Sequence, residues 1–220
     1  MSNYETSQIS DQKELINKLR YTQTLSKNEW IRLIDGRTPE LADYLFENAR
    51  EVRIKHYGHD VYVRGLIEFT NYCRNDCYYC GIRRSNPNVH RYRLTKDEIL
   101  DCCKTGYELG FRTFVLQGGE DGWFTVSRLA DIVSDIHKNW SDCAITLSVG
   151  EMEHDACQTL FDAGADRYLL RHETYDEAHY RKLHPASLSA RHRQNCLWDL
   201  KSIGYQIGTG FMVGAPFQTT

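Results

Sequence analysis

The sequence has no apolar stretch long enough to cross a membrane, because a spanning helix needs about 18 to 20 consecutive apolar residues. Long runs of lysine or arginine are also missing, and the net charge over 220 residues is −3. Neither feature is typical of the basic surface with which proteins bind nucleic acid. The first residues, MSNYETSQISDQKEL, are polar and acidic and lack the apolar segment of a secretory signal. We therefore predict a protein with no nucleic-acid partner and no membrane partner.

The composition that remains is that of an ordinary globular protein. Hydrophobic residues make up 41% and charged residues 26% of the chain, which is enough for one sizeable core. Eight cysteines occur without a secretory signal. This combination indicates a reducing compartment, where clustered thiols bind metals more often than they form disulfides. The sequence thus predicts a cytoplasmic location.

Residues 1–60 carry helical signals and are predicted to form an N-terminal helical segment. Ser26 followed by Glu29 has the spacing of a capping box. Thr38–Pro39 places a capping side chain and a proline at the start of the next helix. That helix is expected to end by Gly58, since glycine commonly follows the last helical turn.

From residue 61 onward, strand-like segments alternate with helix-like segments. The predicted strands are residues 61–69, 111–117, 144–149, 166–171 and 205–213. Four helices are predicted between these strands. The first opens at Thr95, with Glu98 three residues later, and the second covers 127–138. The third ends near Gly164, and the fourth covers 188–203. Such alternation predicts an α/β fold with parallel strands and helices outside them.

We predict that residues 61–220 form the first five units of a (βα) TIM-type barrel, incomplete at the C-terminus. A closed barrel of eight units usually takes about 250 residues. Here five units fill the segment, and the chain stops after the fifth strand. An open five-stranded sheet is the alternative, and the partial barrel is favoured.

Charged residues alternate with apolar ones along these strands. In the first strand the apolar, helix-covered face would hold Val61, Val63, Ile67 and Phe69, and the opposite face would hold Tyr62, Arg64, Leu66 and Glu68. In the third and fourth strands the inward face would hold Ala144, Thr146, Ser148, Arg167, Leu169 and Arg171. Burying guanidinium groups without partners costs several kcal/mol each. We therefore expect a polar cavity inside the barrel that binds a charged molecule, with internal pairing, such as Arg64 with Glu173, as the alternative.

Polar loops follow four of the strands. They are the cysteine run 73–80, GGED (118–121), GE (150–151) and HET (172–174). Parallel α/β folds place their active sites at the carboxyl ends of the strands. The four loops therefore predict a single site at that edge of the sheet.

The segment CRNDCYYC holds Cys73, Cys77 and Cys80 on one short loop. Three thiolates on a four-iron, four-sulfur cluster would leave one iron open, and such clusters pass single electrons at low potential. Zinc needs a fourth ligand, for which His90 is a poor fit by its spacing. A thioredoxin-type pair of Cys77 and Cys80 would leave Cys73 unexplained. The spacing favours a cluster, with zinc and the redox pair as alternatives.

This C-x3-C-x-aromatic-C loop, after the first strand of a (βα) barrel, resembles that of the radical S-adenosylmethionine (SAM) superfamily. Within it, IEFTNYCRNDCYYCGIRR, VLQGGED, TLSVGE and DRYLLRHET are similar to the HydE-type FeFe-hydrogenase maturases, relatives of biotin synthase and methylornithine synthase. The resemblance covers residues 15–218, and LLRHET is its most discriminating segment. It implies a C-terminally truncated chain.

The resemblance also implies a set of site residues. Cys73, Cys77 and Cys80 would bind three irons of the cluster, and SAM would chelate the fourth. The residues that bind SAM would be Tyr79, Gln117, Gly118, Gly119, Glu120, Ser148, Arg171 and Glu173. The substrate cavity would be lined by Arg64, Thr146 and Arg167. Gly118 stands where many relatives carry serine, which would change one hydrogen bond to SAM.

The implied activity is reductive cleavage of SAM to methionine and a 5′-deoxyadenosyl radical, in maturation of the two-iron subcluster of FeFe-hydrogenase. The implied partners are a small iron–carbonyl–cyanide–cysteine substrate, an electron donor such as ferredoxin or flavodoxin, and companion hydrogenase maturases. The setting would be an anaerobic cytoplasm. One alternative is another radical SAM enzyme, similar to methylornithine synthase or biotin synthase. The other is a non-catalytic iron–sulfur or zinc protein whose metal site does not respond to SAM.

Overall fold

The computed structural model describes residues 3–219, and the side chains of residues 10–219. The chain divides into two compact units, one ending at Tyr62 and the other covering Val63–Gln218. This division supports our proposal of a domain boundary near residue 60. Among the described residues, no helix combines the length and apolar character needed to cross a bilayer.

The first unit is helical. Its helices are α1 (Asn3–Thr22), α2 (Lys27–Asp35) and α3 (Pro39–Tyr57). The predicted capping box is present, because Ser26 Oγ accepts from the Glu29 amide at 3.4 Å and the Glu29 carboxylate accepts from the Ser26 amide at 2.8 Å. Thr38 caps α3 and Pro39 is its first residue, as predicted. The buried side chains of this unit include Ile16, Leu25, Leu33 and Leu41.

The second unit is built on one parallel sheet. Its strands are β1 (Gly65–Thr70), β2 (Thr113–Gly118), β3 (Ala144–Ser148), β4 (Arg167–Leu169) and β5 (Gln206–Gly208). All neighbouring strands are parallel, and their order in the sheet is their order in the chain. Within residues 3–219, β1 and β5 are the edge strands of the sheet, and beyond β1 there is one isolated antiparallel bridge, between Thr70 and Arg93. The predicted α/β class with parallel strands is confirmed.

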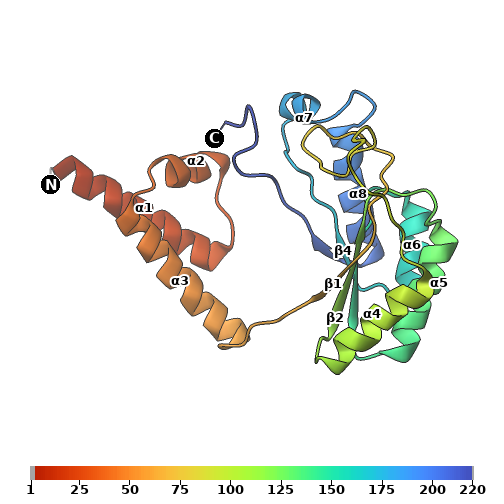
Figure 1. Cartoon of the computed structure of the whole chain (residues 1–220). Coiled ribbons are helices and arrows are strands. Elements are labelled where there is room, and N and C mark those ends of the chain that lie inside the picture. Colours follow the sequence, from red (N-terminus) through yellow and green to blue (C-terminus); the bar gives the residue numbers. More distant parts are fainter. Residues whose placement is uncertain (1–2, 220) are drawn as a thin grey trace. The chain divides into compact units, whose positions relative to one another are not determined.

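Helices of the second unit form a layer beside the sheet (Figure 1). They are α4 (Lys96–Glu108), α5 (Val126–Asn139), α6 (His154–Asp162) and α8 (Ala190–Ile203). Successive members pack against each other, α4 on α5, α5 on α6 and α6 on α8. Right-handed crossovers between parallel strands in chain order put all such helices on one face. This is the wall of a (βα) barrel, with the carboxyl ends of the strands at one edge.

The core lies between this helix layer and the sheet. Ile67 and Phe69 of β1, and Ile145 and Leu147 of β3, are buried there. From the helices they meet Ile99, Leu129, Ile132, Val133, Ile136 and Leu160. Burial of each large apolar side chain stabilises the fold by about 1.5–3 kcal/mol. This packing fixes which strand face points to the helices, and so which face is left for a ligand.

The first strand starts later than the sequence predicts. Residues 61–64 are outside β1, and Val61 and Val63 are 81% and 61% exposed, so their predicted place on the helix-covered face is wrong. Pairing with β2 begins only at Gly65, opposite Phe114. Alternating residues resemble a strand, but without a neighbouring strand they gain no ladder of hydrogen bonds.

The region after β4 also differs from the prediction. β4 and β5 are shorter than predicted, and a short helix, α7 (Glu177–Leu183), lies between β4 and α8. Asp176 caps it by accepting from the His179 amide at 2.7 Å. The signals of this helix were present in the sequence, an aspartate cap followed by Glu177 and basic residues in the last turn.

Candidate functional site

A pocket of about 280 Å³ lies at the carboxyl ends of β1, β2, β3 and β4. It brings together all the residues predicted to hold the cluster or SAM: Cys73, Cys77, Tyr79, Cys80, Gln117, Gly118, Gly119, Glu120, Ser148, Arg171 and Glu173. Gly150 of the third loop also lines it. Segments separated by up to about a hundred residues therefore meet at one edge of the sheet, as parallel topology requires.

The cysteine loop is held by backbone hydrogen bonds to two other elements. The amide of Arg74 donates to the carbonyl of Glu120 at 2.9 Å, and the amide of Tyr78 donates to the carbonyl of Leu183 at 3.0 Å. The amide of Cys80 donates to the Cys77 carbonyl at 3.1 Å. The loop is thus fastened to the loop after β2 and to the end of α7, which leaves its thiols facing the pocket.

The donor set fits an iron–sulfur cluster better than a single ion. In the described part of the chain, no three His, Cys, Asp or Glu side chains converge closely enough to hold one metal ion, whereas zinc needs every ligand within about 2.0–2.3 Å of one centre. A cluster spreads its cysteines over different irons. Burial, and then the nearby thiols of Cys73 and Cys80, raise the pKa of Cys77 to about 11.

The two glycines of GGED let the loop after β2 approach the cysteine loop. A Cβ atom on Gly119 would lie 2.2 Å from the Tyr72 carbonyl oxygen and 2.8 Å from Cys73 Cβ. A Cβ atom on Gly118 would lie 2.7 Å from Thr70 Cγ2. Serine at position 118 would therefore have to displace Thr70 in this chain, which is a physical reason for glycine there.

We expect Gly119→Ala to destabilise the protein by about 1–3 kcal/mol, the usual cost of overpacking, because the new methyl group meets backbone rather than a flexible side chain. Gly122→Ala is the matched control, since a Cβ atom at Gly122 meets nothing within 4 Å. Urea denaturation of both variants measures the difference. Equal stability of the two variants would contradict the close approach of the loops.

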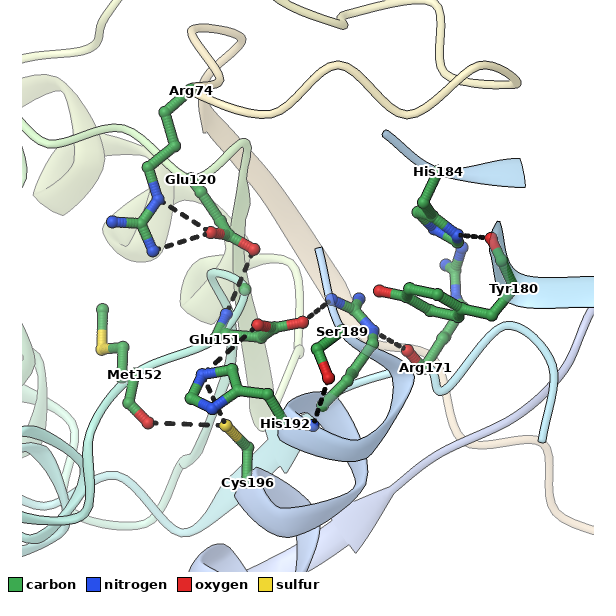
Figure 2. A network of polar contacts seen from close by, with 12 residues as sticks. Arg74, Glu120, Glu151, Met152, Arg171, Tyr180, His184, Ser189, His192 and Cys196 are labelled. Carbon is green, nitrogen blue, oxygen red and sulfur yellow. Dashed lines mark hydrogen bonds and ion pairs between the residues drawn. The ribbon is translucent and has the colours of Figure 1, made fainter. Parts of the chain in front are cut away.

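Glu120 is held at the wall of the pocket by several contacts (Figure 2). Its carboxylate lies 3.0 Å from Arg74 Nη2 and accepts from the Glu151 amide at 3.2 Å. Gly150 makes room for it, because a Cβ atom there would lie 2.0 Å from Glu120 Cγ, and its φ is +87°. A carboxylate fixed in this way can accept hydrogen bonds from an ammonium group.

Asp121, the last residue of GGED, does not line this pocket and instead joins two loops. It accepts from Arg93 Nε and Nη2 at 2.6 and 2.9 Å, from Thr70 Oγ1 at 2.8 Å and from the Trp123 amide at 3.1 Å. Burial acts to raise its pKa, but the hydrogen bonds from Arg93, Trp123 and Thr70 outweigh burial and lower it. The Arg93 guanidinium also lies 3.7 Å over the Tyr72 ring. Asp121 therefore supports the site rather than binding at it.

Glu173 is a buried carboxylate in a strained backbone conformation. It is 7% exposed, and its φ of +64° lies in the left-handed region that disfavours a side chain. Burial raises its pKa, with opposing effects of Arg193 and Arg171. Strain of this kind costs about 1–3 kcal/mol and occurs most often at functional sites. The pairing of Glu173 with Arg64 does not occur, because Arg64 precedes β1 and Glu173 follows β4, at opposite ends of the strands.

Arg193 of α8 is a pocket residue that sequence analysis missed. Its side chain is 15% exposed and its Nη1 lies 2.7 Å from Glu151 Oε1, while the Glu151 side chain is 7% exposed. Arg193 Nε also donates to the Arg171 carbonyl at 2.5 Å. Burial acts to lower the pKa of Arg193, but Glu151 outweighs it and raises the pKa. No local signal marked it, because an arginine in an amphipathic helix is usually on the solvated side.

A second missed element is the support that α7 gives to Tyr79. The Tyr79 hydroxyl lies 3.0 Å from His184 Nε2, and His184 Nδ1 lies 3.0 Å from the Tyr180 carbonyl oxygen. The His184 ring stacks on the Tyr180 ring, with centroids 3.8 Å apart; both residues are labelled in Figure 2. The aromatic residue before the last cysteine is thus fixed by a helix about a hundred residues later in the chain.

The three predicted substrate-cavity residues lie outside this pocket. Arg64 lies before β1, beside Leu66 and Phe111 at the other end of the sheet, which corrects its predicted position. Alternation shows the face of a residue but not its position along the strand axis. Thr146 and Arg167 are neighbours across β3 and β4. The Thr146 hydroxyl is buried without a partner in the described residues, and Arg167 Nε donates to Gln206 Oε1 at 2.8 Å.

Comparison with known proteins identifies relatives of this chain. The family model of the Radical SAM superfamily matches residues 67–220. The chain is 46% identical over 175 residues to the FeFe-hydrogenase maturase subunit HydE of Thermotoga maritima, covering 80% of this chain and 49% of that protein. It is 31% identical over 192 residues to 3-methylornithine synthase of Methanosarcina acetivorans, covering 86% of this chain and 54% of that protein.

A solved structure agrees with these sequence matches. The crystal structure of methylornithine synthase (PylB) aligns with a TM-score of 0.81 and 30% identity, covering 91% of this chain and 59% of that chain. The chain spans about half the length of the curated relatives it matches.

Proposed function

The chain belongs to the Radical SAM superfamily, and we propose that it binds a four-iron, four-sulfur cluster and SAM in the pocket lined by Cys73, Cys77 and Cys80. When bound, the cluster and SAM supply reductive cleavage of SAM to methionine and a 5′-deoxyadenosyl radical. The observation that supports this proposal is the meeting of three thiols with polar residues from three further loops in one pocket. Cluster binding would use the three thiols and leave one iron for SAM.

The proposal assigns roles to the polar residues of the pocket. Glu120, held by Arg74 and the Glu151 amide, would accept from the ammonium group of SAM. Arg171 and Arg193 would provide guanidinium groups for the carboxylate of SAM. Pairs of guanidinium and carboxylate groups favour bidentate geometry. Glu173 would accept from the ribose hydroxyls.

Other pocket residues would position the rest of SAM and the substrate. The backbone of Tyr79 would meet the adenine, while Gln117, Gly118, Gly119 and Ser148 would line the remaining wall. Gln117 Nε2 donates to Glu68 Oε1 at 3.1 Å, so its amide is already oriented. We keep Thr146 and Arg167 as candidates for the substrate cavity, because both lie on the sheet face away from the buried helix layer.

We further propose a role in maturation of the two-iron subcluster of FeFe-hydrogenase. The 46% identity to a HydE subunit supports this role over methylornithine synthesis, for which the identity is 31%. The proposed substrate is a small iron–carbonyl–cyanide–cysteine complex, with companion maturases and a one-electron donor as partners. A reducing cytoplasm is the proposed location, supported by free thiols on all eight cysteines, which lie between residues 73 and 196.

Electron paramagnetic resonance of the anaerobically reconstituted, dithionite-reduced protein tests the proposal, with and without SAM. We expect a cluster signal that changes on addition of SAM, because SAM would bind the open iron. A signal indifferent to SAM would instead favour a non-catalytic iron–sulfur protein. Absence of a cluster, with zinc in the metal analysis, would contradict the proposal.

A further inference from the structure

The loop that carries the cysteines is unusually rich in one sign of charge. Residues 74–93, called here the arginine loop, contain five arginines and a single acidic residue, Asp76, although the chain as a whole has a net charge of −3. The Asp76 carboxylate is engaged by the Ser85 hydroxyl at 2.7 Å. The loop is therefore a positively charged surface on a mildly acidic protein.

Three of the five arginines have structural or pocket contacts. Arg74 pairs with Glu120 and Arg93 with Asp121. The Arg91 guanidinium donates to the carbonyls of Ile82 and Arg83 at 2.8 and 2.7 Å, and also to that of Asn71. The Arg91 side chain thus holds distant parts of the loop together through their backbone carbonyl groups.

Arg83 and Arg84 have no such contacts, although their charges, after the hydrogen bonds from Ser85, help to lower the pKa of Asp76. Among the ion pairs of residues 10–219, neither forms one, Arg84 is exposed, and Arg83 is half-buried. The Arg84 amide donates to the Asn75 carbonyl at 2.8 Å, so the backbone that carries these charges is fixed. The guanidinium groups of Arg83 and Arg84 donate no side-chain hydrogen bond within residues 10–219, so they are available to meet carboxylates of a partner.

This charged surface is next to the cysteines that would hold the cluster. Gly81 follows Cys80 directly, is exposed, and has no heavy atom within 4 Å of where a Cβ atom would stand. Tyr78 is also exposed, at 55%. Its amide contacts Leu183, whose neighbours Arg181 and Lys182 are both exposed at the end of α7. Exposed residues therefore flank the half-buried Cys80, and exposed basic residues lie on this loop and at the end of α7.

We propose that the outer face of the arginine loop, centred on Arg83 and Arg84, is the docking surface for an acidic one-electron carrier protein. The inference rests on the proposed function, since it concerns delivery of the electron that the cluster needs. Electron-transfer encounters use small interfaces and are steered by complementary charge, which raises association rates by about 10- to 1000-fold. An acidic carrier would be guided to the face where the cluster lies nearest to solvent.

Stopped-flow reduction of the cluster-loaded protein by an acidic flavodoxin tests the proposal with R83E/R84E. At an ionic strength of about 0.01 M, where charges act over about 30 Å, we expect the rate to fall roughly tenfold or more. The difference from the parent protein should shrink as salt is added. R50E/K55E is the matched control, because Arg50 and Lys55 are exposed on α3 in the other unit and the pair changes the net charge by the same amount.

A second, uncharged reductant separates docking from damage to the cluster. Photoexcited deazariboflavin should reduce the parent and R83E/R84E at equal rates. If reduction of R83E/R84E by deazariboflavin is also slow, the flavodoxin rate is measured on the milder variant R83Q/R84Q. An unchanged flavodoxin rate for that variant overturns the proposal. Equal flavodoxin rates for the parent and R83E/R84E overturn it directly, while the proposed function survives if deazariboflavin still reduces a cluster that responds to SAM. A parent protein with no cluster would overturn both.

Discussion

Cys77→Ala should abolish assembly of the iron–sulfur cluster and, with it, any cleavage of SAM. Cys77 is the middle of three thiols on one loop, and its removal leaves two ligands for three irons. The half-buried side chain contributes little packing, so we expect the variant to keep its fold, with a loss of about 1 kcal/mol or less. Iron and sulfide content after reconstitution, together with the 5′-deoxyadenosine produced, measure the effect.

Cys102→Ala is the matched control for this experiment. Cys102 lies in α4, is exposed, and does not line the pocket. Its replacement should leave both cluster content and SAM cleavage at the level of the parent protein. Retained SAM cleavage in Cys77→Ala would disprove the metal assignment, and a lost cluster in Cys102→Ala would show that reconstitution responds to any cysteine substitution.

Arg193→Met should be among the most destabilising single substitutions in the second unit. The guanidinium and the Glu151 carboxylate are both largely buried and lie 2.7 Å apart. Removal of one partner from a buried ion pair leaves an uncompensated charge and costs roughly 3–5 kcal/mol. Urea denaturation of the metal-free protein measures this loss without interference from SAM binding.

A double substitution shows whether the unpaired charge is the cause. Arg193→Met with Glu151→Leu removes both charges, and we expect it to recover most of the lost stability, giving a large coupling energy in the double-mutant cycle. Arg191→Met, an exposed position on the same helix, should change stability by about 0.5 kcal/mol or less. A cost below about 1 kcal/mol for Arg193→Met would contradict this prediction and would point to another partner for Glu151, such as His192, whose Nε2 lies 3.5 Å away.

Much of the fold could be predicted because its signals are local. The capping boxes at Ser26 and Thr95 act through side chains three residues away. The apolar residues of α5 recur on one face, and the helix covers Val126–Asn139, close to its predicted limits. By contrast, residues 61–64 alternate like a strand, but β2 offers them no partner, and no local pattern can supply one.

The candidate site divides in the same way. The cysteine spacing, the GGED loop and the HET loop marked pocket residues, because each follows a strand end and parallel topology brings strand ends together. The sequence carried no sign of Arg193, nor of the α7 contacts to Tyr79, since both depend on a helix returning from about a hundred residues away. Arg64 was misplaced for the converse reason, because its neighbours in sequence do not show which end of the sheet it occupies.

The sequence by itself therefore determined the α/β class, the three cysteines that line the pocket and the edge of the sheet that holds it. Each of these follows from periodicity, capping or ligand spacing within a few residues. Only the tertiary structure decided how closely Gly119 approaches Tyr72, which charges are buried in pairs, and which arginines of the cysteine loop remain available at the surface. Those features depend on contacts between distant segments, and the free energy of a buried pair or a close approach exists only once both segments are in place.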